Sequence, residues 1–333
     1  MVLGNFCLLG CIDPCSEAVR LKDASGDWKT FYIRDKLDVG GFSRIDIVVE
    51  KISRRSFALK RIMCHSKGDE DKALTEANFQ LSLPNHPNLL LCIASGIQEV
   101  IQHRQGAISE VLLVLPFSER GTLQREIDIR SLQNNKFPSY VVKTLMTGIC
   151  EGLLALLSLD IPMSHRDIKP GNVLLFEDVR PVLMDFGSVT PATLRIENTK
   201  DVEKWKEFAE ENCSLTYRAP EFFNPTIQQN ITEKADIWSL GCLLYALFFS
   251  KSPMDLVHSR GDSVALAACS ANITFPVYAC SQLPYQVMTL LKLMLSANPQ
   301  DRPSLAQISD FFKNLPTESI HYDSSQNAIT CSF

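Results

Sequence analysis

The sequence predicts an α+β fold in two lobes: a small antiparallel β lobe that carries one main helix, followed by a larger, mainly helical lobe. Residues of about 29–117 contain short stretches in which apolar and polar side chains alternate, which is typical of strands. From about 118 to 315, apolar residues recur with a helical period. The 333 residues, 45% of them hydrophobic, suffice to bury such a core. Residues 1–28 and 316–333 are expected to form tails.

The small lobe is expected to contain a hairpin and a buried strand. Residues 44–49 alternate in polarity, a polar turn follows at 53–56, and residues 57–62 continue as the second strand. Residues 111–115 form a short apolar run that indicates a buried strand. These stretches predict a sheet.

Helical spacing predicts the main helix of the small lobe over residues 69–83, ended by Pro84. In the large lobe, Ser139 is expected to cap one long apolar helix and Thr232 to start another. These two helices would form the centre of the large lobe.

Composition excludes several classes of protein. A net charge of -5 gives no support for nucleic-acid binding, which usually requires a basic face. The most apolar long window, 141–161, is interrupted by Lys143, Glu151 and Asp160, so no membrane span is expected. Residues 1–12 lack the positive start of a signal peptide. The eleven scattered cysteines are mostly expected to be reduced thiols of a cytoplasmic protein.

Three motifs carry the chemistry. His165-Arg166-Asp167-Ile168-Lys169-Pro170-Gly171-Asn172 is followed thirteen residues later by Asp185-Phe186-Gly187, and then by Ala219-Pro220-Glu221. Their order and spacing match the catalytic loop, the metal-binding loop and the end of the activation segment of a protein kinase. Phosphoryl transfer from ATP needs a carboxylate near the incoming hydroxyl, oxygen ligands for a metal, and positive charge on the phosphates.

Each of these requirements has a candidate residue. Asp167 would accept or orient the proton of the substrate hydroxyl, and Lys169 would lie against the transferred phosphate. Asn172 and Asp185 would bind Mg²⁺, or Mn²⁺, that bridges the phosphates of ATP.

Lys60 is expected to reach the α and β phosphates of ATP. It requires a carboxylate partner from the following helix, and Glu76 is the better candidate because it lies about two turns into that helix. Glu70 is the alternative, although an acid in the first turn also suits the helix dipole.

The adenine base is expected under Ile45 and Ala58, against the link that follows the 111–115 strand. There, the carbonyl of Pro116 would accept a hydrogen bond and the amide of Ser118 would donate one. Leu115 would control access to the rear pocket. The full set of expected ATP-binding residues is Leu37, Gly40, Gly41, Phe42, Ser43, Ile45, Ala58, Lys60, Glu76, Leu115, Pro116, Phe117 and Ser118.

Residues of about 29–315 resemble a eukaryotic protein kinase, and several segments are similar to the Numb-associated kinase family. These segments are Gly40-Gly41-Phe42-Ser43, Phe57-Ala58-Leu59-Lys60-Arg61-Ile62, Leu115-Pro116-Phe117, Arg120-Gly121-Thr122-Leu123, Pro181-Val182-Leu183-Met184-Asp185 and Gly261-Asp262-Ser263-Val264-Ala265-Leu266. The resemblance implies a two-lobed protein-kinase fold, magnesium-ATP dependence and phosphorylation of serine or threonine in protein substrates, with some tyrosine activity and autophosphorylation. It also implies that Glu221 pairs with Arg302 and that Asp236 braces the catalytic loop.

The activation segment is long, with 31 residues between Gly187 and Ala219. Residues 201–211 have helical apolar spacing, and the resemblance also implies a helix there; its apolar face would pack onto the large lobe or serve as a docking surface. Ser214, Thr216 and Tyr217 are candidates for phosphorylation, since the added charge would pair with Arg166.

The phosphate loop departs from the expected pattern, because Asp38 stands where glycine is expected and Ser43 takes the third glycine position. Two unit charges about 6 Å apart at an effective dielectric constant near 20 repel by roughly 3 kcal/mol, an upper figure for an exposed group. We expect Asp38 to weaken ATP binding without abolishing catalysis.

The N-terminus is the second departure. Myristoylation requires glycine directly after the initiator, whereas this chain reads Met1-Val2-Leu3-Gly4. Cys7, Cys11 and Cys15 lie among apolar residues and suit palmitoylation, which would anchor the chain peripherally on a membrane. A zinc site and an inert apolar tail are the alternatives. The resemblance implies Golgi or other secretory-pathway membranes.

Three functions are compatible with these observations. An active serine/threonine kinase is favoured by Lys60, Asp167, Asn172 and Asp185. A nucleotide-binding pseudokinase is supported only by Asp38, and a membrane-tethered trafficking scaffold only by the N-terminal cysteines and the activation-segment helix.

Overall fold

The computed structural model describes residues 17–39, 43–100, 106–276 and 283–316. The chain forms two compact units. The first unit contains the residues up to Asn85 together with Leu90–Phe117, and the second contains His86–Leu89 and the chain from Ser118 onward. The phosphate-loop residues Gly40, Gly41 and Phe42, the three N-terminal cysteines and most of the C-terminal tail lie outside the described residues.

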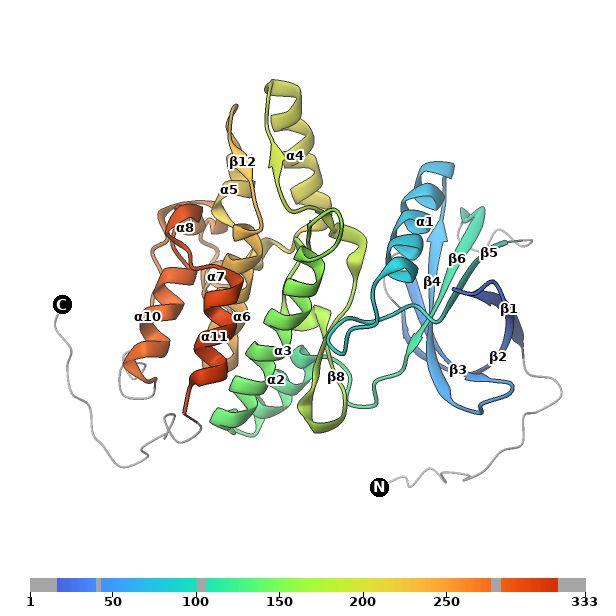
Figure 1. The fold of residues 1–333 in the computed structure, drawn as a ribbon. Coiled ribbons are helices and arrows are strands. Elements are labelled where there is room, and N and C mark those ends of the chain that lie inside the picture. The colour runs from blue at the N-terminus through green and yellow to red at the C-terminus, as the bar shows by residue number, and fades with distance from the viewer. Residues whose placement is uncertain (1–16, 40–42, 101–105, 277–282, 317–333) are drawn as a thin grey trace. The chain divides into compact units, whose positions relative to one another are not determined.

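The first unit is built around a closed antiparallel barrel (Figure 1). The strands follow the order β1-β2-β3-β4-β6-β5, and β1 pairs with β5 to close the barrel. Their bounds are β1 (Ala18–Asp23), β2 (Trp28–Val39), β3 (Ser43–Glu50), β4 (Ser56–Cys64), β5 (Ala94–Glu99) and β6 (Ser109–Pro116). The expectation that residues 1–28 form a tail is therefore wrong for β1, whose alternating apolar residues pair with β2 and cover the barrel core.

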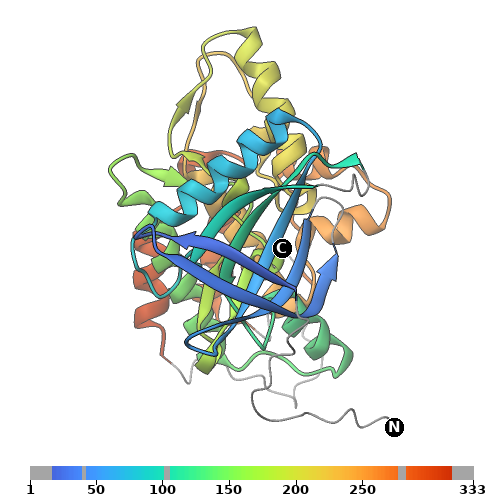
Figure 2. The ribbon, with the colours of Figure 1, turned by 90° about the vertical axis from the view of Figure 1, so that its right-hand side faces the viewer.

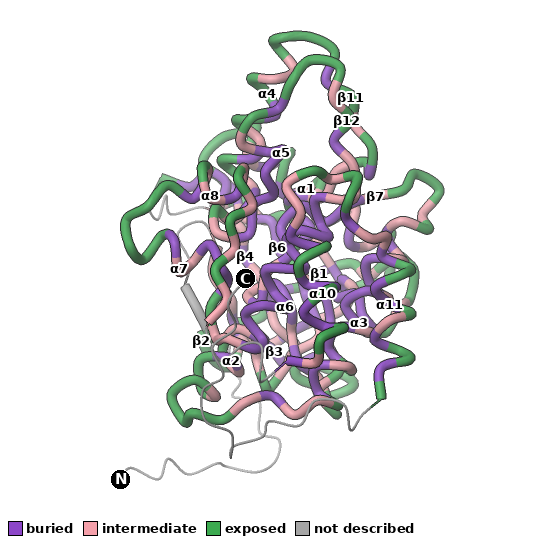
Figure 3. The backbone as a smooth tube through the Cα atoms, turned by 90° about the vertical axis from the view of Figure 1, so that its left-hand side faces the viewer, coloured by how far each residue is buried: buried purple, intermediate pink, exposed green. Residues whose placement is uncertain are grey.

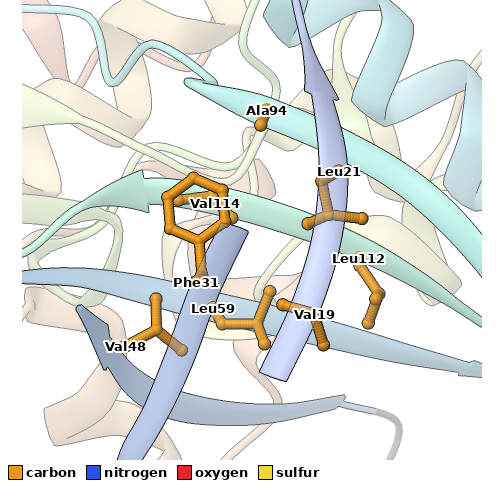
Figure 4. Packing of buried hydrophobic residues seen from close by; sticks show 8 residues of the cluster. All are labelled: Val19, Leu21, Phe31, Val48, Leu59, Ala94, Leu112 and Val114. Carbon is orange, nitrogen blue, oxygen red and sulfur yellow. The ribbon is translucent and has the colours of Figure 1, made fainter. Parts of the chain in front are cut away.

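The core of the barrel consists of apolar side chains contributed by all six strands. Its fully buried members are Val19, Leu21, Phe31, Val48, Leu59, Ala94, Leu112 and Val114 (Figure 4). Gly96 of β5 lies against this core, where a Cβ would come within 2.8 Å of the Leu21 side chain. Glycine is thus required for β5 to approach β1 so closely.

The main helix of the first unit is α1 (Lys67–Ser82). The side chain of Ser66 accepts a hydrogen bond from the Asp69 amide, and the Asp69 carboxylate accepts from the Ser66 amide, which forms a capping box. The predicted helix is confirmed and begins two residues earlier than expected.

The second unit is mainly helical. Its helices are α2 (Leu123–Leu132), α3 (Ser139–Leu157), α4 (Thr199–Asn212), α5 (Pro220–Phe223), α6 (Lys234–Phe249), α7 (Pro253–Ser259), α8 (Val264–Ser270), α10 (Tyr285–Met294) and α11 (Leu305–Asn314). Three two-stranded ribbons connect them: β7 (Met163–Ser164) with β10 (Thr190–Pro191), β8 (Val173–Leu175) with β9 (Pro181–Leu183), and β11 (Leu194–Arg195) with β12 (Asn230–Ile231). Figure 2 gives a second view of both units.

Helices α3 and α6 supply the core of the second unit, and α6 is buried along almost its whole length (Figure 3). By length and composition α3 would suffice to cross a membrane, but it packs against α11 and β9, as a core helix does. Ser139 is its first helical residue and Pro138 occupies the N-cap position, so the predicted cap lies one residue too far along the chain. Helix α6 begins at Lys234, whose amide donates to the Thr232 hydroxyl.

Candidate functional site

A pocket of about 320 Å³ in the second unit brings together the predicted catalytic residues and Asp185, one of the two predicted metal-binding residues. Asp167 enters it from the loop after β7, and Asp185 enters it from the turn after β9. The pocket is lined by Asp167, Lys169, Asp185, Gly187, Ser188, Glu211, Asn212, Cys213 and Ser214. Sequence analysis missed Ser188, Glu211, Asn212 and Cys213. For the last three the signal in the sequence is their position just before Ser214.

The catalytic loop is held by a buried carboxylate of α6. The two oxygens of Asp236 accept hydrogen bonds from the backbone amides of His165 and Arg166, each at 2.8 Å. Arg166 has a φ of 69°, in the left-handed region, where a non-glycine residue is strained. The bonds from Asp236 stabilise this conformation, which confirms the predicted brace.

The carboxylate of Asp167 is fixed through both of its oxygens. Oδ1 accepts a hydrogen bond from the backbone amide of Ser214 at 2.8 Å. Oδ2 accepts one from Nδ2 of Asn172 at 2.9 Å and lies 2.9 Å from Nζ of Lys169. Lys169 also donates to the Ser214 hydroxyl at 2.6 Å. A carboxylate and an ammonium group are thus held side by side in the pocket, as transfer of a phosphoryl group to a hydroxyl requires.

The metal-binding residues offer oxygen donors suited to Mg²⁺. Because Nδ2 of Asn172 donates to both the carbonyl and the carboxylate of Asp167, its Oδ1 is the atom left for a metal. No group of three or more His, Cys, Asp and Glu side chains within the described ranges is arranged to hold a metal. A bound Mg²⁺ would therefore rely on Asn172, Asp185, phosphate oxygens and water, which is how Mg²⁺ commonly binds with nucleotides.

The turn that carries Asp185 is fixed by its neighbours. Phe186 is buried, and its ring centroid lies 5.6 Å from that of His165. His165 Nε2 is 3.1 Å from the Met184 carbonyl, and the Met184 amide donates to the Asn172 carbonyl at 3.0 Å. The two predicted metal-binding residues are thereby tied together through backbone.

In the first unit, Lys60 of β4 forms an ion pair with Glu76 of α1 at 2.8 Å. The alternative partner, Glu70, instead accepts a hydrogen bond from the Ser109 hydroxyl at 2.7 Å and pairs with Lys67. The choice of Glu76 is therefore confirmed.

The residues expected around the adenine base lie on one sheet face of the barrel. Ala58 is directly opposite both Ile47 and Leu115, and Ile45 is opposite Lys60, so their side chains share a face. Of the other expected members, Ser43 pairs with Ile62 and shares this face, and Leu37 is half exposed in β2. Pro116, the last residue of β6, is opposite Phe57 and therefore lies on the other face, and Phe117 follows it.

Ser118 belongs to the second unit. Its hydroxyl donates to the Leu175 carbonyl at 2.5 Å and accepts from the Gly121 amide at 3.2 Å. The Ser118 side chain therefore ties the start of the second unit to β8.

The long activation segment contains helix α4, as predicted. Asn198 caps it, with its side chain accepting from the Asp201 amide at 3.1 Å. On its apolar face Trp205 stacks on Phe208 at 4.9 Å and meets Phe222 of α5 edge-on at 5.2 Å. The apolar face thus packs onto the second unit.

The expectation that Arg166 pairs with a phosphate on the activation segment is not supported. Arg166 is buried, and its guanidinium donates to the Thr190 hydroxyl and to the carbonyls of Thr232, Pro191 and Ala192 at 2.6–3.1 Å. It also lies over the Trp205 ring at 5.7 Å. Burial lowers the pKa of Arg166. Protein groups thus already occupy the position proposed for a phosphate.

The three phosphorylation candidates differ in exposure. Ser214 is bound to Lys169 and Asp167, so a phosphate there would disrupt the catalytic pair. The Tyr217 side chain is buried, and burial raises the pKa of its phenol, which argues against modification in the folded chain. Thr216 is partly exposed, and its carbonyl accepts from the Ser252 hydroxyl.

The end of the activation segment is fixed by a buried ion pair. Arg302 donates from both terminal nitrogens to the two oxygens of Glu221, each at 2.8 Å. Arg302 also donates to the carbonyls of Lys234, Ser296 and Ala297. The pairing expected for these residues is confirmed.

Comparison with known proteins agrees with this geometry. Residues 31–311 match the family model described as the protein kinase domain. Serine/threonine-protein kinase 16 of Rattus norvegicus is 38% identical to this chain over 282 residues, which cover 84% of this chain and 88% of the relative. Serine/threonine-protein kinase 16 of Homo sapiens is also 38% identical, with the same coverage of both chains. Serine/threonine-protein kinase ppk13 of Schizosaccharomyces pombe is 29% identical, again over 84% and 88%.

The matched region includes most of both units, the Lys60–Glu76 pair and the pocket around Asp167, but not β1. This chain therefore belongs to the protein kinase family.

Proposed function

We propose that this chain transfers the γ-phosphoryl group of ATP to serine or threonine hydroxyls of protein substrates. The observation that carries the proposal is the fixed carboxylate of Asp167 beside Lys169 and Asn172. The names of the relatives, which are serine/threonine kinases, support the same choice of acceptor.

In this mechanism the free lone pairs of the Asp167 carboxylate accept the proton of the substrate hydroxyl and orient its oxygen toward the γ-phosphorus. A bond forms between that oxygen and the phosphorus while the bond to the bridging oxygen of ADP breaks. Lys169 offsets the charge of the transferred group at the acceptor. Mg²⁺, held by Asn172 and Asp185, would neutralise phosphate charge.

The first unit also contains residues that would bind ATP. In the first unit, the Lys60 ammonium, positioned by Glu76, would bind the α and β phosphates, and the face formed by Ile45, Ala58 and Leu115 would contact the adenine. ATP is thus the proposed co-substrate, with Mg²⁺ or Mn²⁺ as cofactor.

The segments that resemble the Numb-associated kinase family support placing the chain in that branch, with autophosphorylation and some tyrosine activity. Cys7, Cys11 and Cys15 support palmitoylation and peripheral attachment to Golgi or other secretory-pathway membranes. Two acyl chains anchor a soluble domain where one does not, so more than one of these cysteines would be modified.

The test is transfer of labelled γ-phosphate from magnesium-ATP to the protein itself and to a generic basic protein, with wild type and Asp167→Ala compared. Label with the wild type alone is expected, on phosphoserine and phosphothreonine. Equal absence of label from both, with folding intact, would instead favour a nucleotide-binding scaffold.

A further inference from the structure

The outer side of the β1–β2 pair carries an exposed tryptophan between two cations. Trp28 is 59% exposed, with the Arg20 guanidinium 5.4 Å and the Lys22 ammonium 5.2 Å from its ring. Lys22 pairs directly with Trp28 across the strands, and Arg20 is two residues away on the same side. We call Arg20, Lys22 and Trp28 the Trp28 face.

This exposure is not a consequence of poor packing. Val19 and Leu21, which alternate with Arg20 along β1, are buried in the barrel core, so the strand has a fixed inward and outward side. The other two tryptophans, Trp205 and Trp238, are buried. A large aromatic ring is thus kept in solvent on a rigid strand pair.

Two acids, Asp23 and Asp27, neighbour this face, and both are engaged in the β1–β2 connection, where the Asp27 carboxylate accepts from the Ser25 hydroxyl at 3.1 Å. The Asp23 carboxylate is turned into the β1–β2 connection, where it accepts hydrogen bonds from Ser25 and from the Asp27 amide and pairs with Lys29 at 3.4 Å. The side chains of Arg20 and Lys22 are exposed, and their cations remain available to an anionic partner.

We propose that the Trp28 face rests on the surface of an anionic lipid bilayer. Tryptophan prefers the headgroup region, where its ring is half apolar and half hydrated, and lysine and arginine bind the anionic headgroups around it. A rigid two-stranded platform presents all three side chains to one plane.

The length of chain between this face and the N-terminal cysteines favours the same partner. Cys15 precedes Arg20 by five residues. An extended chain advances at most ~3.6 Å per residue, so the two Cα atoms are separated by no more than about 18 Å. This step rests on the proposed acylation: with Cys15 attached to lipid, the short connection would keep the Trp28 face close to the membrane surface.

The experiment uses the full chain prepared without acyl groups and follows tryptophan emission on titration with vesicles. The vesicles contain phosphatidylcholine and phosphatidylserine and carry brominated acyl chains. They are expected to quench Trp28 fluorescence and to shift its emission to the blue, whereas vesicles of phosphatidylcholine alone should have neither effect. Trp28→Phe should remove the response, because the remaining tryptophans are buried.

The charge dependence has a matched control. Arg20→Gln with Lys22→Gln is expected to weaken vesicle binding about 30-fold, at about fivefold for each cation. Lys251→Gln with Arg260→Gln, which removes the same charge from exposed sites of the second unit, should leave binding unchanged. Thermal melting checks that both double variants are folded.

Three results would overturn the proposal. The first is no quenching of Trp28 at saturating lipid, and the second is an equal loss of vesicle binding in the two double variants. The third is an emission shift with polyglutamate but none with vesicles, which would identify an acidic protein as the partner. Acylation is tested separately by membrane fractionation of the Cys7→Ser, Cys11→Ser, Cys15→Ser variant in cells. Because the vesicle assay contains no acyl group, failure of one proposal is distinguishable from failure of the other.

Discussion

The backbone amide of Ser214 donates a hydrogen bond to Oδ1 of Asp167, at a distance of 2.8 Å. The two residues are 47 positions apart, so this bond joins the activation segment to the catalytic loop. The Ser214 hydroxyl adds a second connection, because it accepts from Lys169 at 2.6 Å. The position of the Asp167 carboxylate therefore depends on the conformation of the activation segment.

Substitutions at Ser214 should separate these two contacts. Ser214→Thr keeps the hydroxyl and is expected to retain most activity, whereas Ser214→Ala loses one hydrogen bond to a charged group and should lower kcat/KM about tenfold. Ser214→Glu, which places a negative charge beside Asp167, should be almost inactive. Steady-state phosphorylation of a peptide measures all three; a gain of activity with glutamate would show that phosphorylation of Ser214 activates the enzyme.

The Lys60–Glu76 pair should be required for rate and not for folding. Both side chains are partly exposed, at 19% and 12%, so the pair contributes little to stability. Glu76→Gln is expected to lower kcat at least tenfold with little change in Tm, because Lys60 loses its positioning charge. Glu70→Gln in the same helix is the matched control and should keep kcat near wild type. If Glu70→Gln lowered kcat more than Glu76→Gln did, the assignment of Glu76 as the partner of Lys60 would be contradicted.

The Glu221–Arg302 pair should be required for folding. Arg302 is almost fully buried, and removing one partner of a buried ion pair leaves an uncompensated charge, which costs about 3–5 kcal/mol. Arg302→Met should therefore lower the unfolding free energy by this amount, measured by urea denaturation. Adding Glu221→Gln to Arg302→Met should recover part of the loss. No recovery would mean that the carbonyl contacts of Arg302 account for the effect.

Buried thiols should make the protein less stable at alkaline pH. Burial raises the pKa of Cys92, Cys150 and Cys213 from 9.0 to about 12. Between pH 9 and pH 12 the unfolded chain loses thiol protons that the native chain retains, so the free energy of unfolding falls as pH rises, by about 1.4 kcal/mol per pH unit for each thiol.

Urea denaturation between pH 8 and about pH 10 measures this slope. Cys150→Ala removes one thiol and should make the slope shallower, although it lowers stability at every pH. If Cys150→Ala left the slope unchanged, groups other than this thiol would account for the loss of stability at alkaline pH. The same thiols should resist alkylation at neutral pH, because the thiolate is the reactive form.

Asp38 should limit affinity for ATP. It lies in β2 opposite Ile45, immediately before the phosphate loop. Asp38→Gly is expected to lower the Kd of ATP several-fold, because it removes a negative charge near the phosphates. Isothermal titration with magnesium-ATP provides the measurement, and Asp35→Gly, an exposed position of the same strand, is the control. Equal affinity in wild type and Asp38→Gly would refute the expectation.

The local pattern of apolar and polar residues was sufficient to predict most helices and strands of the fold. The α1 helix, the β3–β4 hairpin and α4 follow from apolar periodicity, and the catalytic and metal-binding loops follow from motifs with a fixed spacing. The choice of Glu76 over Glu70 also followed from sequence, since its place in the helix sets which carboxylate faces Lys60. These features depend on residues close together in the chain.

Contacts between distant residues were not accessible from local pattern, and the Glu221–Arg302 pair was expected only through the family resemblance. That β1 closes the barrel depends on pairing between Lys22 and Ser95, and its six residues alone gave too short a pattern to distinguish a strand from a tail. The role of Arg166 was mispredicted because its partners, the carbonyls of Pro191, Ala192 and Thr232, are backbone groups that no side-chain motif records.

The sequence by itself determined the family, and its motifs predict Asp167 as the catalytic carboxylate and Asn172 and Asp185 as metal ligands, because phosphoryl transfer requires those residue types at that spacing. Only the tertiary structure decided that Ser214 holds Asp167, that Arg166 is satisfied within the protein, and that Trp28 stays in solvent between two cations. The physical reason is that burial and hydrogen bonding depend on which segments meet in space, whereas a motif records only residues that are near in the chain.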